Sequence, residues 1–173
     1  MITLPNECYY EIFNNLCHDY KNLFSCALVN RQWCRIIIPI LWRKPNLKDI
    51  RVIRIFLLTL NENELAPLIP FKINFPNHPK PLFEYTNYIT SINNSLHDGV
   101  MNWLVYEGFK MHAAPDVESS LIAMILRTSE NLKSLIINEI ICNQLVFENL
   151  YENTTVLSIS LCKIRDDYKS KRK

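Results

Sequence analysis

Cysteine and histidine are the residues of this sequence that could act as nucleophiles or metal ligands. The 173 residues include six cysteines and four histidines. The histidines occur singly, and no HExxH, HxE or paired CxxC spacing brings metal ligands together. A thiol hydrolase needs a cysteine close to a histidine, but the one adjacent pair, Cys17 and His18, points in different directions on a helix. We therefore expect no catalytic residue, no metal ion and no cofactor, and a protein that is not an enzyme.

The glycines and the charge distribution exclude further classes. Gly99 and Gly108 are the only glycines, too few for a phosphate-binding loop, a dinucleotide-binding motif or a kinase glycine loop. The formal net charge is +2, and residues 163–173 hold six basic and two acidic side chains. A nearly neutral chain with a short basic end lacks the broad basic face that duplex nucleic acid requires. We expect a solvated basic tail and no nucleic-acid partner.

The N-terminus and the hydropathy pattern indicate in which cellular compartment to expect the protein. The opening residues MITLPNECYYEIF lack the basic segment, apolar run and cleavage site of a secretory signal peptide. Arg51 and Arg54 interrupt the best apolar run, so no segment has the length of a membrane span. We expect a protein of the cytoplasm, the nucleus or both, without a membrane partner, whose cysteines are free and buried thiols.

Residues 4–42 have the pattern of three short helices. Pro5 suits a first helical turn, and Glu7 faces the positive end of the helix dipole there. Asp19 is a suitable N-cap for the second helix, and Pro39 is expected to bend or end the third. Apolar residues recur at helical spacing in this region, so each helix presents a stripe that must be buried.

The order of short sequence signals in this region resembles an F-box. The matching elements are, in chain order, Leu4-Pro5-Asn6-Glu7, Ile12-Phe13-Asn14-Asn15-Leu16, Leu23, Leu28-Val29-Asn30-Arg31-Gln32-Trp33 and Leu41-Trp42. Each element alone is a weak signal, but the ordered set is a strong one, and it is similar to fungal F-box proteins. Two departures concern only local geometry: Cys8 stands where the family usually has Leu or Val, and the turn at residues 17–22 is longer than the commonest one.

An F-box implies a three-helix module that docks on the Skp-type adaptor of SCF cullin–RING ubiquitin ligases and, through it, on the cullin. The resemblance implies that the positions with which the family binds the adaptor correspond here to Leu4, Pro5, Glu7, Ile12, Phe13, Leu16, Val29 and Trp33. The apolar members of this set could also belong to the internal core, because helices bury their apolar stripes. A module of about 40 residues buries little area, so its surplus apolar surface favours a partner.

Residues 46–115 indicate a helical and proline-rich linker region. Apolar residues recur at helical intervals from Leu47 to Leu60, which predicts a helix that packs behind the three-helix module. Five prolines in residues 67–81 exclude an uninterrupted helix and favour an extended connector. The aromatic residues of 82–112 have roughly helical spacing without interleaved basic residues, so we expect them in a core rather than in a stacking platform.

Residues 116–173 contain a period that is typical of leucine-rich repeats. Leu135-Ile136-Ile137 and Leu157-Ser158-Ile159 begin 22 residues apart, which is the length of such a repeat. As parallel strands, these segments would bury the alternate residues Leu135, Ile137, Leu157 and Ile159. Ile136 and Ser158 would then face the opposite, concave side, where we expect a protein substrate. Ordinary alternating strands would give the same pattern, and two imperfect copies are fewer than the ~3 repeats that a stable array usually needs.

These patterns together predict a mostly α fold. An N-terminal three-helix F-box (1–45) precedes a helical and proline-rich linker (46–115) and a truncated, α/β leucine-rich-repeat-like part with a basic tail (116–173). The leading hypothesis is a substrate-recognition adaptor subunit of an SCF-type ligase, with the Skp-type adaptor, the cullin and an unidentified protein substrate as partners. The alternative is a scaffold outside any ligase, or a truncated copy that sequesters the Skp-type adaptor.

Overall fold

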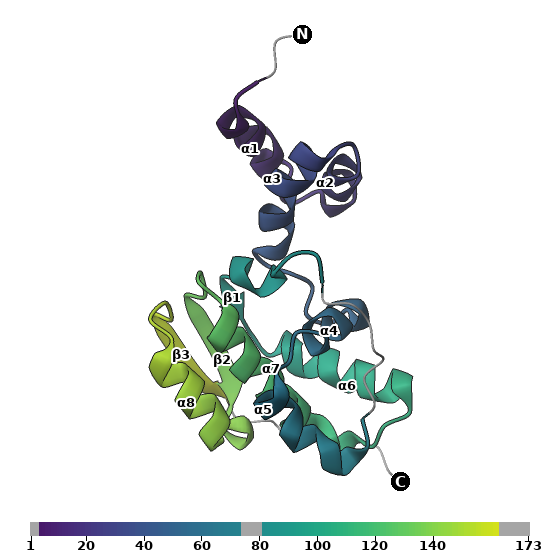
Figure 1. The fold of residues 1–173 in the computed structure, drawn as a ribbon, viewed down its shortest axis with the longest axis vertical. Coiled ribbons are helices and arrows are strands. Elements are labelled where there is room, and N and C mark those ends of the chain that lie inside the picture. Colours follow the sequence, from purple (N-terminus) through teal and green to yellow (C-terminus); the bar gives the residue numbers. More distant parts are fainter. Residues whose placement is uncertain (1–3, 74–80, 163–173) are drawn as a thin grey trace.

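The structure is a computed structural model that describes residues 4–73 and 81–162. It is mostly helical, as the sequence predicts, and contains a small parallel sheet. The α-helices are α1 (Asn6–Asn15), α2 (Tyr20–Ala27), α3 (Arg31–Trp42), α4 (Ile50–Leu57), α5 (Glu62–Leu65), α6 (Ser95–Glu107), α7 (Ala114–Thr128) and α8 (Gln144–Glu152). The 3-10 helices are η1 (Ala66–Phe71), η2 (Tyr85–Tyr88), η3 (Met111–Ala113) and η4 (Glu139–Ile141), and the strands are β1 (Ser91–Ile92), β2 (Ser134–Asn138) and β3 (Ser158–Cys162). Helices α1–α3 stand off one end of a larger body that holds the sheet (Figure 1).

The N-terminal module (residues 4–42) has a small core of its own. Asp19 and Asn30 cap α2 and α3, because their side-chain oxygens accept hydrogen bonds from backbone N–H groups in the first turn of each helix. The buried apolar residues are Phe13, Leu23, Ala27, Ile37, Ile38, Ile40 and Leu41. The third helix does not end at Pro39 but continues to Trp42, although proline removes one helical hydrogen bond. The three helices expected in this region are therefore present, the third with its proline inside.

Trp42 joins the N-terminal module to the larger body. Its ring stacks on Tyr85 with 4.2 Å between the ring centroids and lies 6.0 Å from the ring of Phe56. Directly after it, the Arg43 carbonyl oxygen accepts hydrogen bonds from the backbone N–H and the hydroxyl of Thr90. Helix α3 thus ends against two separate segments of the larger body, and the Trp42 side chain packs against both cores.

The larger body (residues 47–162) is organised around one continuous core. Its buried side chains come from α4, α6, α7, α8 and the sheet. Helix α7 is central and is buried over Val117–Leu126. Helix α6 passes so close to the loop before α4 that a Cβ added to Gly99 would lie 1.9 Å from the Leu47 carbonyl oxygen, so only glycine fits there. The core crosses residue 115, where the sequence suggests a boundary between regions.

The three strands are parallel and lie in the order β1-β2-β3. Ile92 pairs with Leu135, which in turn pairs with Ile159, so β2 and β3 pair residues 24 apart rather than the 22 of the sequence period. Leu157 falls just before β3 and is 80% exposed, and Ile159 is 45% exposed. Their predicted burial is wrong, because the core of the larger body covers Ile92 and Leu135 of the same row but does not extend to β3.

The proline-rich segment is partly helical rather than extended. Residues 66–71 form the 3-10 helix η1, in which Pro67 stands near the start and Pro70 lies inside. A proline at the start of a helix costs little, because the N–H it lacks would have no partner there. The remainder of the predicted connector includes residues 74–80, which lie outside the described residues.

The cysteines depart from the expectation of buried thiols. All six are free, but Cys8 is exposed and the other five are half-buried. Cys8 lies on the outer side of α1, and so it does not contribute to the module core. Their free state agrees with the prediction, and their burial does not.

Candidate partner-binding surface

The N-terminal module exposes large apolar side chains. Those at least 36% exposed are Leu4, Tyr10, Ile12, Tyr20, Phe24, Leu28 and Val29. Leu28 and Val29 are the most exposed of these, at 72% and 61%, although Leu23 and Ala27 of the adjoining helix are buried. Because the module closes its core without them, these side chains form a surface suited to a partner.

Helix α1 has an inner and an outer side. Phe13 is 2% exposed and packs edge to face against Trp33, with 5.0 Å between the ring centroids. Its neighbour Ile12 is exposed, as is Cys8 one turn earlier, because one residue along a helix turns the side chain by about 100°. Phe13 is therefore a core residue of the module in this structure, and its predicted contact with the adaptor stays a prediction.

The other predicted adaptor-binding residues differ in exposure. The exposed ones are Leu4, Pro5, Glu7, Ile12 and Val29. Glu7 lies in the first turn of α1, where its carboxylate faces the positive end of the helix. Leu16 and Trp33 are half-buried and pack against the module core, so each can present only part of its surface to a partner.

Sequence reasoning missed Phe24 and Leu28 as surface residues. They are four residues apart at the end of α2 and so lie on the same side. Leu23 and Ala27, also four residues apart, occupy the buried side of the same helix. This double spacing is the signal that could have found them, because a helix with two apolar stripes buries only one against a single neighbour.

Polar side chains fix α1 in one orientation against α3. The Arg43 guanidinium donates hydrogen bonds to Asn14 Oδ1 at 3.2 Å and to the Tyr10 hydroxyl at 2.5 Å. At the start of α1, the Gln32 side-chain amide donates to Asn6 Oδ1 at 2.9 Å. Both ends of α1 are thus attached, and its outer side is preformed before any partner binds.

Ile136 and Ser158, the predicted substrate-facing residues, lie on one face of the sheet. The register pairs Ile136 with Ser160 and Ser134 with Ser158, and paired residues of parallel strands point to the same side. The opposite face carries Leu135, which is 1% exposed. Ser158 is exposed and Ile136 half-buried, so Ser158 offers the more accessible side chain.

Two buried carboxylates in the larger body already have protein partners. Glu64, which is 1% exposed, accepts hydrogen bonds from the Arg127 guanidinium at 2.7 and 3.0 Å. Glu118, 4% exposed, lies 2.8 Å from Nδ1 of His97. The hydrogen bond to this carboxylate raises the pKa of His97 above its ordinary value, because it favours the protonated ring. Both carboxylates thus stabilise the fold by pairing with a basic side chain.

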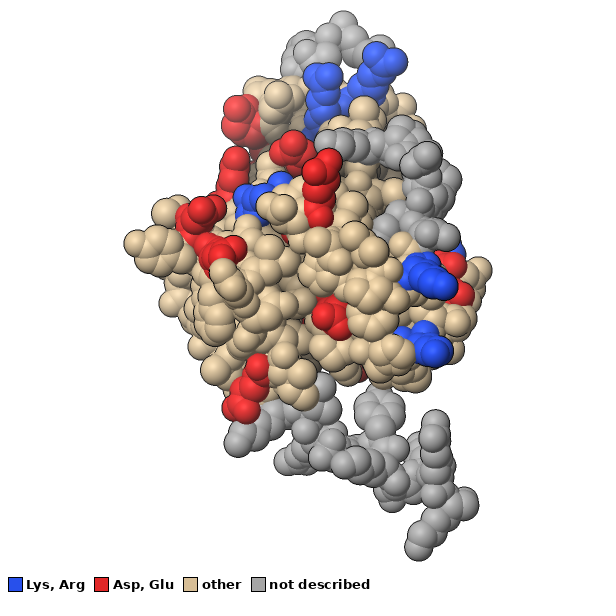
Figure 2. All heavy atoms as spheres, turned by 60° about the horizontal axis from the view of Figure 1, so that its bottom comes forward, with Lys and Arg blue, Asp and Glu red and all other residues tan. Residues whose placement is uncertain are grey.

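The described residues contain neither a metal centre nor a membrane-spanning helix. Within them, no group of three His, Cys, Asp or Glu side chains could hold a metal ion, and none of their helices combines the length and hydropathy of a membrane span. On the face shown in Figure 2, acidic and basic side chains are interspersed without a continuous basic field. The predicted basic tail, residues 163–173, lies outside the described residues.

A comparison with protein families agrees with the N-terminal motif. The family model described as F-box-like matches residues 1–48. No curated protein and no solved structure matches the chain. Residues 1–48 are therefore an F-box-like domain, and the exposed apolar residues of the N-terminal module lie within it.

Proposed function

We propose that this chain is a substrate-recognition adaptor subunit of an SCF-type cullin–RING ubiquitin ligase. Its F-box-like domain binds a Skp-type adaptor, and through it the cullin, while the larger body holds a protein substrate. The chain itself catalyses nothing: it raises the local concentration of a substrate lysine near the charged ubiquitin carrier. Its place of action is the cytoplasm, the nucleus or both.

This proposal rests on one observation: the residues that match the family model also expose apolar side chains that the module core does not use. F-box domains generally bind Skp-type adaptors, and here the F-box-like residues 1–48 include side chains that the module leaves outside its core. Leu28 and Val29 follow one another at the end of α2, and Phe24 lies one turn before Leu28. Apolar side chains that cluster at such a site are typical of the centre of a protein–protein interface.

The architecture of the larger body supports a role in holding a substrate. Strand β2, helix α8 and strand β3 follow one another, and the two strands are parallel neighbours. A strand followed by a helix in each repeat is the arrangement of leucine-rich repeats. We propose that this part is leucine-rich-repeat-like, of the kind found in fungal F-box proteins, and that the sheet face with Ile136 and Ser158 contacts the substrate.

A charge placed in the apolar surface tests adaptor binding. The full chain with Leu28→Asp should bind a purified Skp-type adaptor roughly ten- to hundredfold more weakly in calorimetry, as for an interface anchor worth about 1–3 kcal/mol. Tyr151→Asp, on an α8 side chain that is 93% exposed, is the matched control and should bind as the unaltered chain does. If both variants bind equally well with unchanged circular dichroism, this surface does not contact the adaptor.

A pull-down of the full chain from cells separates the ligase role from the alternative. Recovery of the cullin together with the Skp-type adaptor supports the ligase role. Recovery of the adaptor without the cullin favours a scaffold or a sequestering protein. The three-stranded sheet of the described residues favours this second candidate, because it offers a substrate only a small surface.

A further inference from the structure

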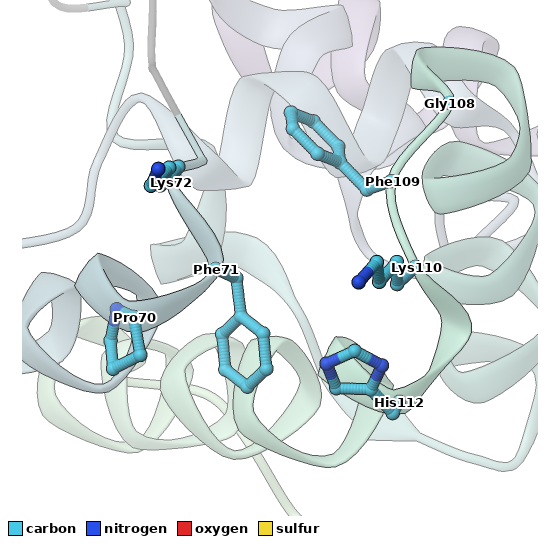
Figure 3. A pocket seen from close by; sticks show the side chains of 7 residues that line it. All are labelled: Pro70, Phe71, Lys72, Gly108, Phe109, Lys110 and His112. Carbon is cyan, nitrogen blue, oxygen red and sulfur yellow. The ribbon is translucent and has the colours of Figure 1, made fainter.

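A cavity of about 400 Å³ opens between the end of η1 and the segment that follows α6 (Figure 3). One wall consists of residues 70–72, and the other consists of residues 108–110 with His112. The cavity lies in the larger body, outside the F-box-like domain, and the proposed function does not use it. Its volume is within the range of sites that bind small organic groups.

The lining of this cavity combines basic and aromatic side chains. Lys72, Lys110 and His112 supply nitrogen donors, Phe71 and Phe109 supply rings, and no acidic side chain takes part. None of the three basic residues belongs to an ion pair within the part of the chain that the structure describes. In Figure 3, Lys110 and His112 extend from one wall toward Phe71 on the other. Positive charge that no neighbouring carboxylate neutralises attracts an anion.

Packing holds the two aromatic walls in place. The Phe71 ring lies 5.3 Å from the His112 ring at an angle of 55°, so these residues meet across the two walls. Phe109 packs against the buried Trp103 with 5.6 Å between the ring centroids. Both phenylalanines also contact the core of the larger body. The cavity is therefore preformed, which reduces the cost of binding a ligand.

The backbone around the cavity adds a second observation. Lys72, with a φ of 52°, is the one non-glycine residue in the left-handed region among the described residues, and Gly108, with a φ of 76°, is the one such glycine. Both line this cavity. A left-handed lysine is uncommon, and residues in such conformations concentrate at ligand sites. The chain thus holds Lys72 in a costly conformation in one wall of this cavity.

We propose that this cavity binds a dianionic phosphate monoester carried on a flat apolar group, as in an aryl phosphate. Such a phosphate carries about −1.5 to −2 charges at pH 7, which the ammonium groups of Lys72 and Lys110 balance. The His112 ring can donate a further hydrogen bond. Phe71 and Phe109 contact the flat group. A monoanion leaves part of this positive charge unpaired, and a neutral ring leaves all of it unpaired.

Titration of the full, isotope-labelled chain with phenyl phosphate tests the site. We expect a dissociation constant on the order of millimolar, as for a ligand of this size, and resonance shifts at the amides of Gly108, Phe109 and Lys110. Benzenesulfonate, a monoanion of similar shape, should bind several-fold more weakly, and phenol should cause no shifts. Equal binding of phenyl phosphate and phenol, or no shifts at these amides, would overturn the proposal.

Single variants place the binding in this cavity. Lys110→Met and Lys72→Gly, which suits the left-handed backbone, should each weaken phenyl phosphate binding roughly tenfold, since each removes a charged hydrogen-bond donor. Lys133→Met is the control, because Lys133 follows the end of α7 that is distant from His112, and it should bind normally. Unchanged affinity in both cavity variants contradicts the proposal, and their well-dispersed spectra would show that they are folded.

Two sources could supply the aryl phosphate, and one further titration distinguishes them. A short peptide that contains phosphotyrosine should bind more tightly than phenyl phosphate if the natural ligand is a phosphorylated protein. Binding no tighter than that of phenyl phosphate assigns the cavity to a free small molecule. The unphosphorylated peptide should not bind, and equal binding of both peptides would overturn the phosphate site.

Discussion

The N-terminal module and the end of the larger body both expose apolar side chains, but for different reasons. In the module, Ile12 and Phe24 are exposed, whereas Phe13 and Leu23, their neighbours on the same helices, are buried. At the end of the body, Ile159 faces the same side of the sheet as its pairing partner Leu135, yet it is 45% exposed against 1%. The exposed residues of the module point away from the module core. On β3, Ile159 lies on the same sheet face as the buried Leu135, but at the edge of the core of the larger body.

This difference shows that the exposure of an apolar side chain has a different cause in each of the two regions. Along a helix, exposure follows from the angle of the side chain, and one residue is enough to change it. In the sheet, paired residues point to the same side, and exposure follows from whether the core covers that part of the face. Surface residues of the module can therefore be changed without cost to the fold, and the following predictions test whether the same holds for β3.

The largest expected effect separates β2 from β3. Leu135→Asp should unfold the larger body, because it buries an uncompensated charge in a site that is 1% exposed. Ile159→Asp, at the paired position, should lower the free energy of unfolding by less than about 1 kcal/mol, as for a substitution near the surface. Thermal and urea denaturation measure both. A loss of folding in both variants would mean that β3 is covered as fully as β2.

The next effect separates two neighbours on α1. Phe13→Ala should cost about 3–5 kcal/mol of stability, because it leaves a cavity against Trp33 in the module core. Ile12→Ala should leave the melting temperature nearly unchanged and weaken binding to the Skp-type adaptor, since truncating an interface anchor typically costs about 1–3 kcal/mol. Melting curves and calorimetry on the same two preparations give both readouts. The reverse pattern would exchange the inner and outer sides of α1.

Trp42→Ala tests whether the two cores are coupled. Trp42 is half-buried, so the loss should be about 2–3 kcal/mol, below that of a fully buried aromatic side chain. Because the ring contacts both cores, hydrogen exchange should accelerate in the module and around Tyr85 together. Leu47→Ala, which opens only the core of the larger body, is the control. Faster exchange confined to the module in Trp42→Ala would show that the cores are independent.

The smallest effect concerns the half-buried His97 and its buried partner Glu118. The folded state raises the pKa of His97, so the pair contributes its full stability below the ordinary histidine pKa and loses it as the pH rises through the folded pKa. The difference in melting temperature between the unaltered chain and Glu118→Gln should therefore shrink as the pH rises above the ordinary histidine pKa. A difference that stays constant with pH would mean that His97 does not titrate with this partner.

Much of the module could be predicted from the sequence, because its signals are local. Asp19 caps α2 as its position suggests, and the ordered motif from Leu4 to Trp42 lies within the residues that the family model matches. The roles of Ile12 and Phe13 could not be separated, because adjacent apolar residues both fit one stripe until the neighbouring helix is placed. Phe24 and Leu28 were missed although their spacing, beside that of Leu23 and Ala27, indicates a second apolar stripe on α2.

The larger body was harder to predict, because its contacts join distant residues. Nothing near Gly99 in the sequence indicates that the Leu47 carbonyl oxygen occupies the space of a Cβ. The period of 22 residues located both strands but gave a register shifted by two, because it aligns similar apolar residues and does not report which residues pair across the sheet. Burial on β3 depended on what lies beside it, which no single strand sequence contains.

The joint at Trp42 has a consequence for geometry. Helix α3 has 12 residues and so extends about 18 Å, and its last residue, Trp42, stacks on Tyr85 of the larger body. A substrate bound to the sheet would therefore be held at a fixed distance and orientation from the partner of the N-terminal module. The position of a lysine on the substrate surface, rather than the sequence around it, would then decide whether it receives ubiquitin.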